Sequence, residues 1–147
     1  MKSARRRARE GLVQGLYQWL LTHHEVPVIR AQIVSQERFA RADLAFFDRV
    51  LAAVVHQSDL LDARLQPYLD REAKQLSPVE RAVLWIGAYE LLSHPETPFR
   101  VIINEAVELA KVFGGTDGHK YVNGVLDRLS LEVRPQEVKA RATQSGD

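Results

Sequence analysis

One stretch decides the fold: Ser77-Pro78-Val79-Glu80-Arg81-Ala82-Val83-Leu84-Trp85-Ile86-Gly87-Ala88-Tyr89-Glu90-Leu91-Leu92. Ser77 can accept from the free amides of a first helical turn, Pro78 suits the first helical position, and Glu80 completes a capping box. The next uncharged run, residues 82–89, is apolar on nearly every side of a helix, and such helices are normally buried. We therefore predict the central helix of an all-α domain. The pattern leaves Trp85 open, either as a core residue or as part of a contact surface.

Composition bounds the rest of the chain. With 147 residues, 46% hydrophobic and 27% charged, the chain is expected to be one globular domain with a sizeable core. The absence of cysteine excludes disulfides and thiolate chemistry and fits a reducing compartment. No apolar run approaches the roughly 20 residues of a membrane span, and the basic N-terminus lacks the apolar segment of a signal peptide. We expect a cytoplasmic protein with no membrane contact.

The basic residues are concentrated at one end. Formal net charge is only +1, yet no acid precedes Glu10 and five cations lie before it: Lys2, Arg5, Arg6, Arg7 and Arg9. They occupy the first turns of an amphipathic helix predicted over residues 4–21, where the helix dipole disfavours positive charge. Tyr17 lies further along the face that Arg5 and Arg9 share. The pattern favours an anionic partner; the alternative is a basic terminus that only aids solubility.

Apolar spacing of three to four residues predicts the remaining helices. Three of them cover residues 27–36, 43–67 and 99–113, and the second has a break near residues 57–59. A last helix follows, capped by Thr116 or Asp117. Gly124 within that last helix predicts close approach of another helix. No strand or repeat is predicted, so the fold is an all-α bundle of about seven helices. Residues 1–133 form the domain, and the polar residues 134–147 are expected to be a disordered tail.

No catalytic or metal-binding constellation is found. Glu105 and Glu108 share a helix face, but without a histidine at matching spacing they are interpreted as a solvated face. His23 and His24 are adjacent and point apart, which makes a poor metal pair. Gly114 and Gly115 lack the spacing of a phosphate-binding loop, although the following helix N-terminus can attract anions. We predict no enzyme activity, no catalytic residue, no metal and no cofactor.

Two blocks of the sequence carry a family resemblance. The first is Arg5-Arg6-Arg7-Ala8-Arg9-Glu10 followed by Gln14-Gly15-Leu16-Tyr17. The second runs from Val101-Ile102-Ile103-Asn104-Glu105-Ala106 through Phe113-Gly114 to Asp117-Gly118-His119-Lys120-Tyr121-Val122-Asn123-Gly124. Both resemble the NusB family of bacterial transcription antitermination proteins, as does the central helix. The resemblance covers nearly the whole chain in order, apart from residues 25–42 and the tail.

The resemblance implies a helical fold of two three-helix bundles and a function without catalysis. A NusB-like protein is expected to bind the single-stranded boxA element of nascent rRNA transcripts. It would do so as a heterodimer with the ribosomal protein NusE. With NusA, NusG and RNA polymerase, that heterodimer would form an antitermination complex.

The resemblance also implies site residues. The RNA-binding set, with Arg7 added from the same basic cluster, is Lys2, Arg5, Arg6, Arg7, Arg9, Tyr17, Phe113, Asp117, Lys120 and Tyr121. Cations that hold phosphates and rings that stack on bases are what single-stranded RNA recognition requires. Asp117 is expected to cap a helix or limit affinity. Glu80 matches a position expected to face NusE; Arg81 and Trp85 can share its exposed face. The family is expected to have arginine at position 85. Trp85 would there serve either as a hydrophobic anchor for the partner or as the seed of a homodimer.

Two other functions compete with this one. An rRNA cytosine methyltransferase can carry an N-terminal RNA-binding region that resembles NusB, but it would need a downstream Rossmann-like domain. A purely structural helical bundle would self-associate without RNA, which light scattering with and without RNA would show.

Overall fold

The computed structural model describes residues 2–115 and 117–144, and within them the chain is helical with no strand. The helices are α1 (Ala4–Thr22), α2 (Val26–Val34), α3 (Leu44–His56), α4 (Ser58–Leu65), α5 (Pro78–Ser93), α6 (Phe99–Phe113), α7 (Gly118–Val133) and α8 (Pro135–Gln144). Short 3-10 turns lie at η1 (Glu37–Phe39), η2 (Gln66–Tyr68) and η3 (Ala73–Gln75). The all-α prediction is confirmed. Thr116, one of the two predicted caps, lies outside the described residues.

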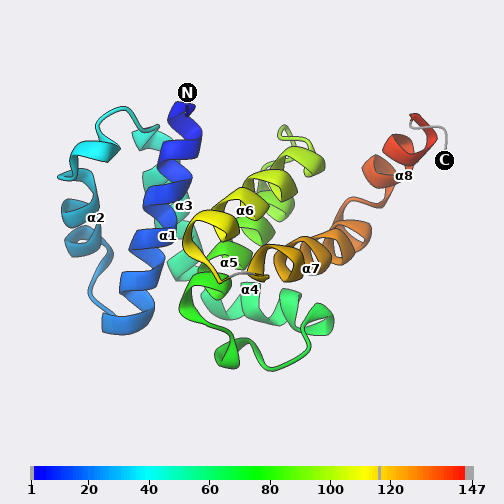
Figure 1. Ribbon diagram of the computed structural model, residues 1–147, viewed down its shortest axis with the longest axis horizontal. Coiled ribbons are helices and arrows are strands. Elements are labelled where there is room, and N and C mark those ends of the chain that lie inside the picture. Colours follow the sequence, from blue (N-terminus) through cyan, green and yellow to red (C-terminus); the bar gives the residue numbers. More distant parts are fainter. Residues whose placement is uncertain (1, 116, 145–147) are drawn as a thin grey trace.

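The helices form two bundles that meet at α5 (Figure 1). Helices α1, α2 and α3 pack together at one side, and α5, α6 and α7 pack together at the other, with α4 against α5. Residues 82–91 of α5 are all buried, so the predicted central helix is confirmed. At Gly87 an added Cβ would lie 2.6 Å from a Leu126 methyl, so α7 packs directly on the α5 backbone. Gly124 has no such neighbour within 4 Å, and the close approach predicted there is wrong.

Local signals set several helix ends as expected. Ser77 Oγ accepts from the Glu80 amide at 3.2 Å and donates to the Glu80 carboxylate at 2.9 Å, which fixes the start of α5. Asp43 caps α3 by accepting from the Phe46 amide at 3.0 Å. The six-turn helix predicted over residues 43–67 divides at Gln57 into α3 and α4, inside the predicted break.

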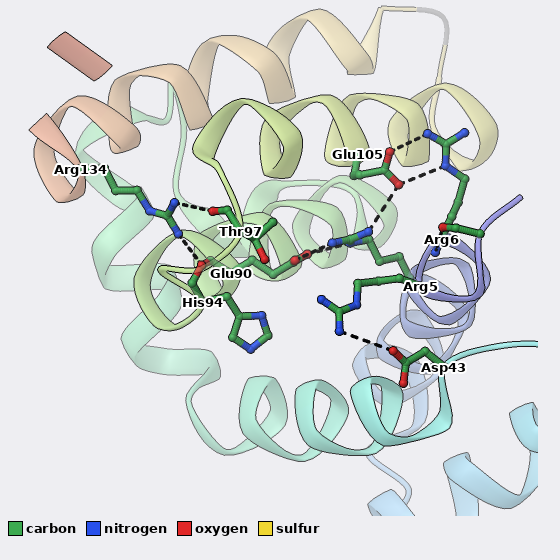
Figure 2. Close-up of polar contacts among 10 residues, drawn as sticks. Arg5, Arg6, Asp43, Glu90, His94, Thr97, Glu105 and Arg134 are labelled. Carbon is green, nitrogen blue, oxygen red and sulfur yellow. Dashed lines mark hydrogen bonds and ion pairs between the residues drawn. The ribbon is translucent and has the colours of Figure 1, made fainter. Parts of the chain in front are cut away.

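The C-terminal residues differ from the predicted disordered tail. Arg134 is buried and donates to four carbonyls around the end of α5, as Figure 2 shows in part: those of Glu90, Leu91, His94 and Thr97. It also donates to Glu137, whose other oxygen accepts from the Phe99 amide at the start of α6 at 2.7 Å. The Leu91 carbonyl at the end of α5 and the Phe99 amide at the start of α6 are helix-end groups without an intrahelical partner, and these bonds satisfy both. The structure places residues 135–144 in helix α8, which extends from α7 at the end of the molecule opposite α2 (Figure 1).

His94 lies buried between the two bundles. It is 6% exposed, with its ring centroid 5.7 Å from Phe46 and 5.4 Å from Tyr89, and its Nδ1 has no hydrogen-bond partner among the described residues. Burial lowers its pKa, and of the charged groups nearby, Glu90 and Glu96 raise it whereas Arg49 and Arg5 lower it. The folded state therefore disfavours the protonated ring.

Stability should consequently fall as the solution is acidified. The contribution of neutral His94 is complete above the unfolded-state pKa of 6.5 and is lost as the pH falls below it. We expect His94→Phe to flatten the dependence of the urea midpoint on pH between 7 and 5. His24→Phe, at an exposed loop position, is the matched control and should keep the wild-type profile. Parallel profiles for wild type and His94→Phe would contradict this assignment.

Candidate nucleic-acid interface

The arginines of α1 divide between the core and the surface. Arg9 is only 4% exposed and its guanidinium donates to Glu90 at 2.9 and 2.7 Å and to Glu105 at 3.4 Å. Glu90 is itself 1% exposed, so this ion pair ties α1 to α5 inside the protein. Arg9 was predicted to hold RNA phosphate; the structure places it in the core instead, because it meets acids from two distant helices.

Arg6 lies at the rim of the same network (Figure 2). It donates to both oxygens of Glu105, at 3.1 and 2.5 Å, and remains 39% exposed. These hydrogen bonds, followed by the nearby charges of Arg6 and Arg9, lower the pKa of Glu105 against the effect of burial. Glu105 is therefore part of an ion-pair network, and its interpretation as a solvated face is wrong. Glu108, 48% exposed, fits that interpretation.

The other cations of the cluster lie on the surface. Arg5 is 3.5 Å from Asp43 and its guanidinium covers the Phe46 ring at 4.4 Å. Lys2 pairs with Glu10 at 2.9 Å and is 51% exposed. Arg7 makes no ion pair or side-chain hydrogen bond within residues 2–115 and 117–144, so its charge is uncompensated there. Although Arg9 belongs to the core, Lys2, Arg5, Arg6 and Arg7 therefore remain as surface cations at the start of α1.

A groove runs beside these cations between α1, η1 and the end of α6. Its polar end has a volume of about 110 Å³, and its apolar end about 560 Å³. The two ends share Gln14, Gln36, Arg38 and Phe113. Tyr17, 41% exposed, lines the apolar end, so the fold brings the predicted rings of Tyr17 and Phe113 to one groove.

Arg38 is a groove residue that the sequence did not reveal. Residues 25–42 are the stretch excepted from the family resemblance, and no site residue was predicted among them. The position of Arg38 depends on tertiary packing: an added Cβ at Gly11 would lie 2.6 Å from the Phe39 ring, so η1 rests directly on α1. No sequence signal gives that contact, and therefore none places Arg38 beside Arg7 and Lys2 at the polar end of the groove.

The remaining predicted RNA residues form a separate cluster at the start of α7. Asp117 occupies the N-cap position without a side-chain cap bond and lies 3.6 Å from Lys120, both highly exposed. Tyr121 donates to Asp70 at 2.9 Å, and burial raises its pKa. Hydrogen bonds from Arg71 and Tyr121 lower the pKa of Asp70 to about 2. None of the three predicted residues lines the groove.

Of the predicted partner-binding residues Glu80, Arg81 and Trp85, only the first two have accessible side chains. Trp85 is fully buried, its Nε1 donates to Asp62 at 2.8 Å, and the Trp19 ring lies 5.9 Å away. Arg81 donates to the same carboxylate at 3.3 and 2.5 Å and covers the Trp85 ring at 4.9 Å. Trp85 is therefore a core residue, and its prediction as a partner anchor or homodimer seed is wrong. Glu80 is half-exposed beside Gly118, at the start of α7.

Two kinds of site are not found among residues 2–115 and 117–144. No group of three histidine, cysteine, aspartate or glutamate side chains is arranged to hold a metal ion. No helix in those residues is long and apolar enough to cross a membrane.

The fold and the groove define an all-helical protein of two bundles whose candidate functional surface is basic and aromatic. Residues 6–130 match the model of the NusB family, and the chain belongs to that family. It is 56% identical over 142 residues to the transcription antitermination protein NusB of Paraburkholderia phymatum, covering 97% of this chain and 98% of that protein. It is 51% identical to the NusB protein of Thiobacillus denitrificans, over 95% of this chain and 96% of the relative. The predicted family and the prediction that the chain is not an enzyme are confirmed.

Solved structures agree with this membership. T. maritima NusB superposes with a TM-score of 0.80 at 29% identity, covering 95% of this chain and 99% of that one. A crystal structure of the antitermination factors NusB and NusE in complex with double-stranded RNA matches with a TM-score of 0.74 at 21% identity, over 88% and 97% of the two chains. At that identity the second likeness shows the fold alone. The NusB-like fold predicted from the sequence is confirmed.

Proposed function

We propose that this protein is a transcription antitermination factor that binds boxA RNA of nascent rRNA transcripts as a heterodimer with NusE. The observation that carries the proposal is the groove beside α1, where surface cations and two aromatic rings from different helices meet. Cations attract the phosphate backbone, and exposed rings stack on unpaired bases. Lys2, Arg5, Arg6 and Arg7 would contribute charge, and Tyr17 and Phe113 the stacking faces.

The complex is proposed to act in the cytoplasm with NusA, NusG and RNA polymerase. Membership of the NusB family motivates both partners, and a solved structure of this fold contains NusB and NusE in complex with double-stranded RNA. The cluster of Asp117, Lys120 and Tyr121 lies next to Glu80 through the contact of α7 with the start of α5. We assign Glu80 and the exposed edge of Arg81 to NusE, and Lys120 and Tyr121 to RNA that continues past the groove.

A titration tests the proposal. Fluorescent boxA-type and scrambled oligonucleotides, each single-stranded and as duplexes, are titrated with the full chain in the presence and absence of NusE. We expect the boxA-type single strand to bind more tightly than the scrambled one, and NusE to increase the difference. Equal affinity for both sequences in the presence of NusE would refute specific recognition of boxA.

Tyr17→Ala should weaken RNA binding while leaving the fold intact. Its ring is 41% exposed at the apolar end of the groove, so truncation removes a stacking face without opening the core. Loss of one base–aromatic contact is expected to cost about 1–3 kcal/mol of binding free energy. Val28→Ala is the control, since Val28 is 46% exposed on α2 and does not line the groove. An unchanged affinity for Tyr17→Ala would remove this ring from the site.

A further inference from the structure

We propose that the groove between α1, η1 and the end of α6 is a subsite for one nucleotide of the bound RNA. An unpaired base would enter the apolar end, and the adjoining phosphate would lie at the polar end, held by Arg38 together with Arg7. The inference rests on the proposed RNA-binding function. It places one nucleotide of the RNA in the groove and adds Arg38, to which the sequence assigned no role, to the RNA-binding residues.

The apolar end has the size and lining of a base-binding pocket. Its volume of about 560 Å³ lies within the range of small-ligand sites, roughly 300–1,000 Å³. The rings of Tyr17 and Phe113 line it together with the aliphatic side chains of Val13, Leu21, Ile33 and Val79. Tyr17 and Leu21 lie one turn apart on α1 and remain 41% and 58% exposed. Packing within the chain thus leaves an aromatic and aliphatic surface uncovered at this point.

The polar end has the charge that a phosphodiester requires. Lys2, Arg7 and Arg38 line it, and the single acid among the lining residues is Glu10, which Lys2 already pairs. Within the described parts of the chain, neither Arg7 nor Arg38 forms an ion pair with a carboxylate. Two cations therefore face the groove without a compensating charge, and this favours an anion next to the apolar end.

Arg38 is held in place by neutral groups. Its Nε donates to Gln36 Oε1 at 3.1 Å. With the Gln14 amide in the orientation that satisfies its neighbours, Gln14 Oε1 accepts from the two terminal nitrogens of Arg38 at 3.1 and 2.6 Å. Two amides orient the guanidinium without neutralising it. An oriented guanidinium fork is well suited to a phosphate group.

The same two glutamines lie where the two ends of the groove meet. The Gln14 oxygen already accepts twice from Arg38, and the Gln36 oxygen accepts from Arg38 and, at 3.1 Å, from Gln14. The remaining amide N–H groups of Gln14 and Gln36 are therefore placed to donate to the edge of a base whose face contacts Tyr17 or Phe113. Tyr17 lines only the apolar end, Lys2 and Arg7 line only the polar end, and the two amides lie with Arg38 and Phe113 where the ends meet. This arrangement matches a nucleotide whose base lies at the apolar end and whose phosphate lies at the polar end. A peptide segment of a protein partner would use the apolar surface but not the unpaired cations.

The first test compares Arg38→Ala with Arg41→Ala. Both arginines are exposed and three residues apart, but Arg41 does not line the groove. With a single-stranded boxA-type oligonucleotide, Arg38→Ala is expected to weaken binding about tenfold, the loss of a charged hydrogen bond. It should also lower the slope of log K against log salt by about 0.7, the value for one single-strand phosphate contact. Arg41→Ala should match wild type.

The second test removes bases from the RNA one at a time. With the wild-type protein, removal of one particular base is expected to lower the affinity about 5- to 100-fold, whereas removal of any other base should have a much smaller effect. Removal of that particular base should have little effect in Tyr17→Ala, because the base and the ring belong to one contact. Circular dichroism and thermal melting of each variant exclude misfolding as the cause.

The outcomes separate the subsite from the function. If wild type binds none of the RNAs, the proposed function fails and the subsite with it. If wild type binds RNA but Arg38→Ala behaves as Arg41→Ala and abasic losses are evenly spread, only the subsite is overturned. If Arg38→Ala keeps its RNA affinity and loses NusE instead, the groove is a protein-docking site and the inference is wrong.

Discussion

Glu90→Ala is expected to destabilise the folded protein by about 3–5 kcal/mol, because it leaves the Arg9 guanidinium buried without its main partner. Arg9 and Glu90 are 4% and 1% exposed and share two hydrogen bonds of 2.9 and 2.7 Å. Glu105 accepts from Arg9 only at 3.4 Å and is also bound by Arg6, so it compensates the loss of Glu90 only in part. Urea unfolding at neutral pH, followed by circular dichroism, measures the change in free energy.

Glu108→Ala is the matched control, since it removes the same charge from an exposed position on α6. It should change the free energy of unfolding by no more than about 0.5 kcal/mol. The double variant Arg9→Met with Glu90→Leu removes both buried charges and should recover most of the stability, as replacement of a buried ion pair by apolar groups often does. A loss below about 1 kcal/mol for Glu90→Ala would show that Arg9 can leave the core.

The double variant also tests the functional assignment of Arg9. If Arg9 serves only to join α1 to α5, the salt slope of RNA binding should equal that of wild type. A slope lower by about 0.7 would indicate that Arg9 reaches a phosphate after all.

The sequence predicts those features that depend on neighbours along the chain. Ser77 and Asp43 signalled helix starts, the break at Gln57 was visible in the apolar spacing, and the uncharged run in α5 indicated burial. These are local patterns, and the structure confirms them. The resemblance to the NusB family added the arrangement in two bundles, which periodicity alone did not give.

Features that depend on distant partners were not predictable. Arg9 shares a helix face with Arg5, and only the arrival of Glu90, 81 residues further along, makes it a core residue. Arg134 was assigned to a disordered tail because its neighbours are polar, although the carbonyls at the end of α5 bind it. Charge in a sequence is a poor guide to exposure when its partner is remote, since a paired and hydrogen-bonded cation can be buried. Arg38 shows the converse, a cation brought to a groove by the packing of its neighbour Phe39.

The sequence left Trp85 open as a core residue or as part of a contact surface, and the structure places it in the core. We therefore expect Trp85→Ala to lower the free energy of unfolding by about 3–5 kcal/mol. The indole is fully buried and touches both bundles, through Trp19 of α1 and through Asp62 of α4. Truncation leaves a cavity at their junction and removes the ring that Arg81 covers. The free energy of unfolding in urea measures the loss.

Trp85→Phe separates stability from partner binding. It keeps an aromatic ring but loses the Nε1 bond to Asp62, whose carboxylate retains Arg81. We expect a smaller destabilisation, about 1–3 kcal/mol, and a folded protein whose affinity for NusE equals that of wild type. The affinity should be unchanged because no part of Trp85 is accessible to a partner in the folded chain. A variant that unfolds at nearly the wild-type urea concentration yet loses NusE would return Trp85 to the docking surface. Glu80→Ala is the comparison, since its half-exposed side chain is the one we assign to that surface.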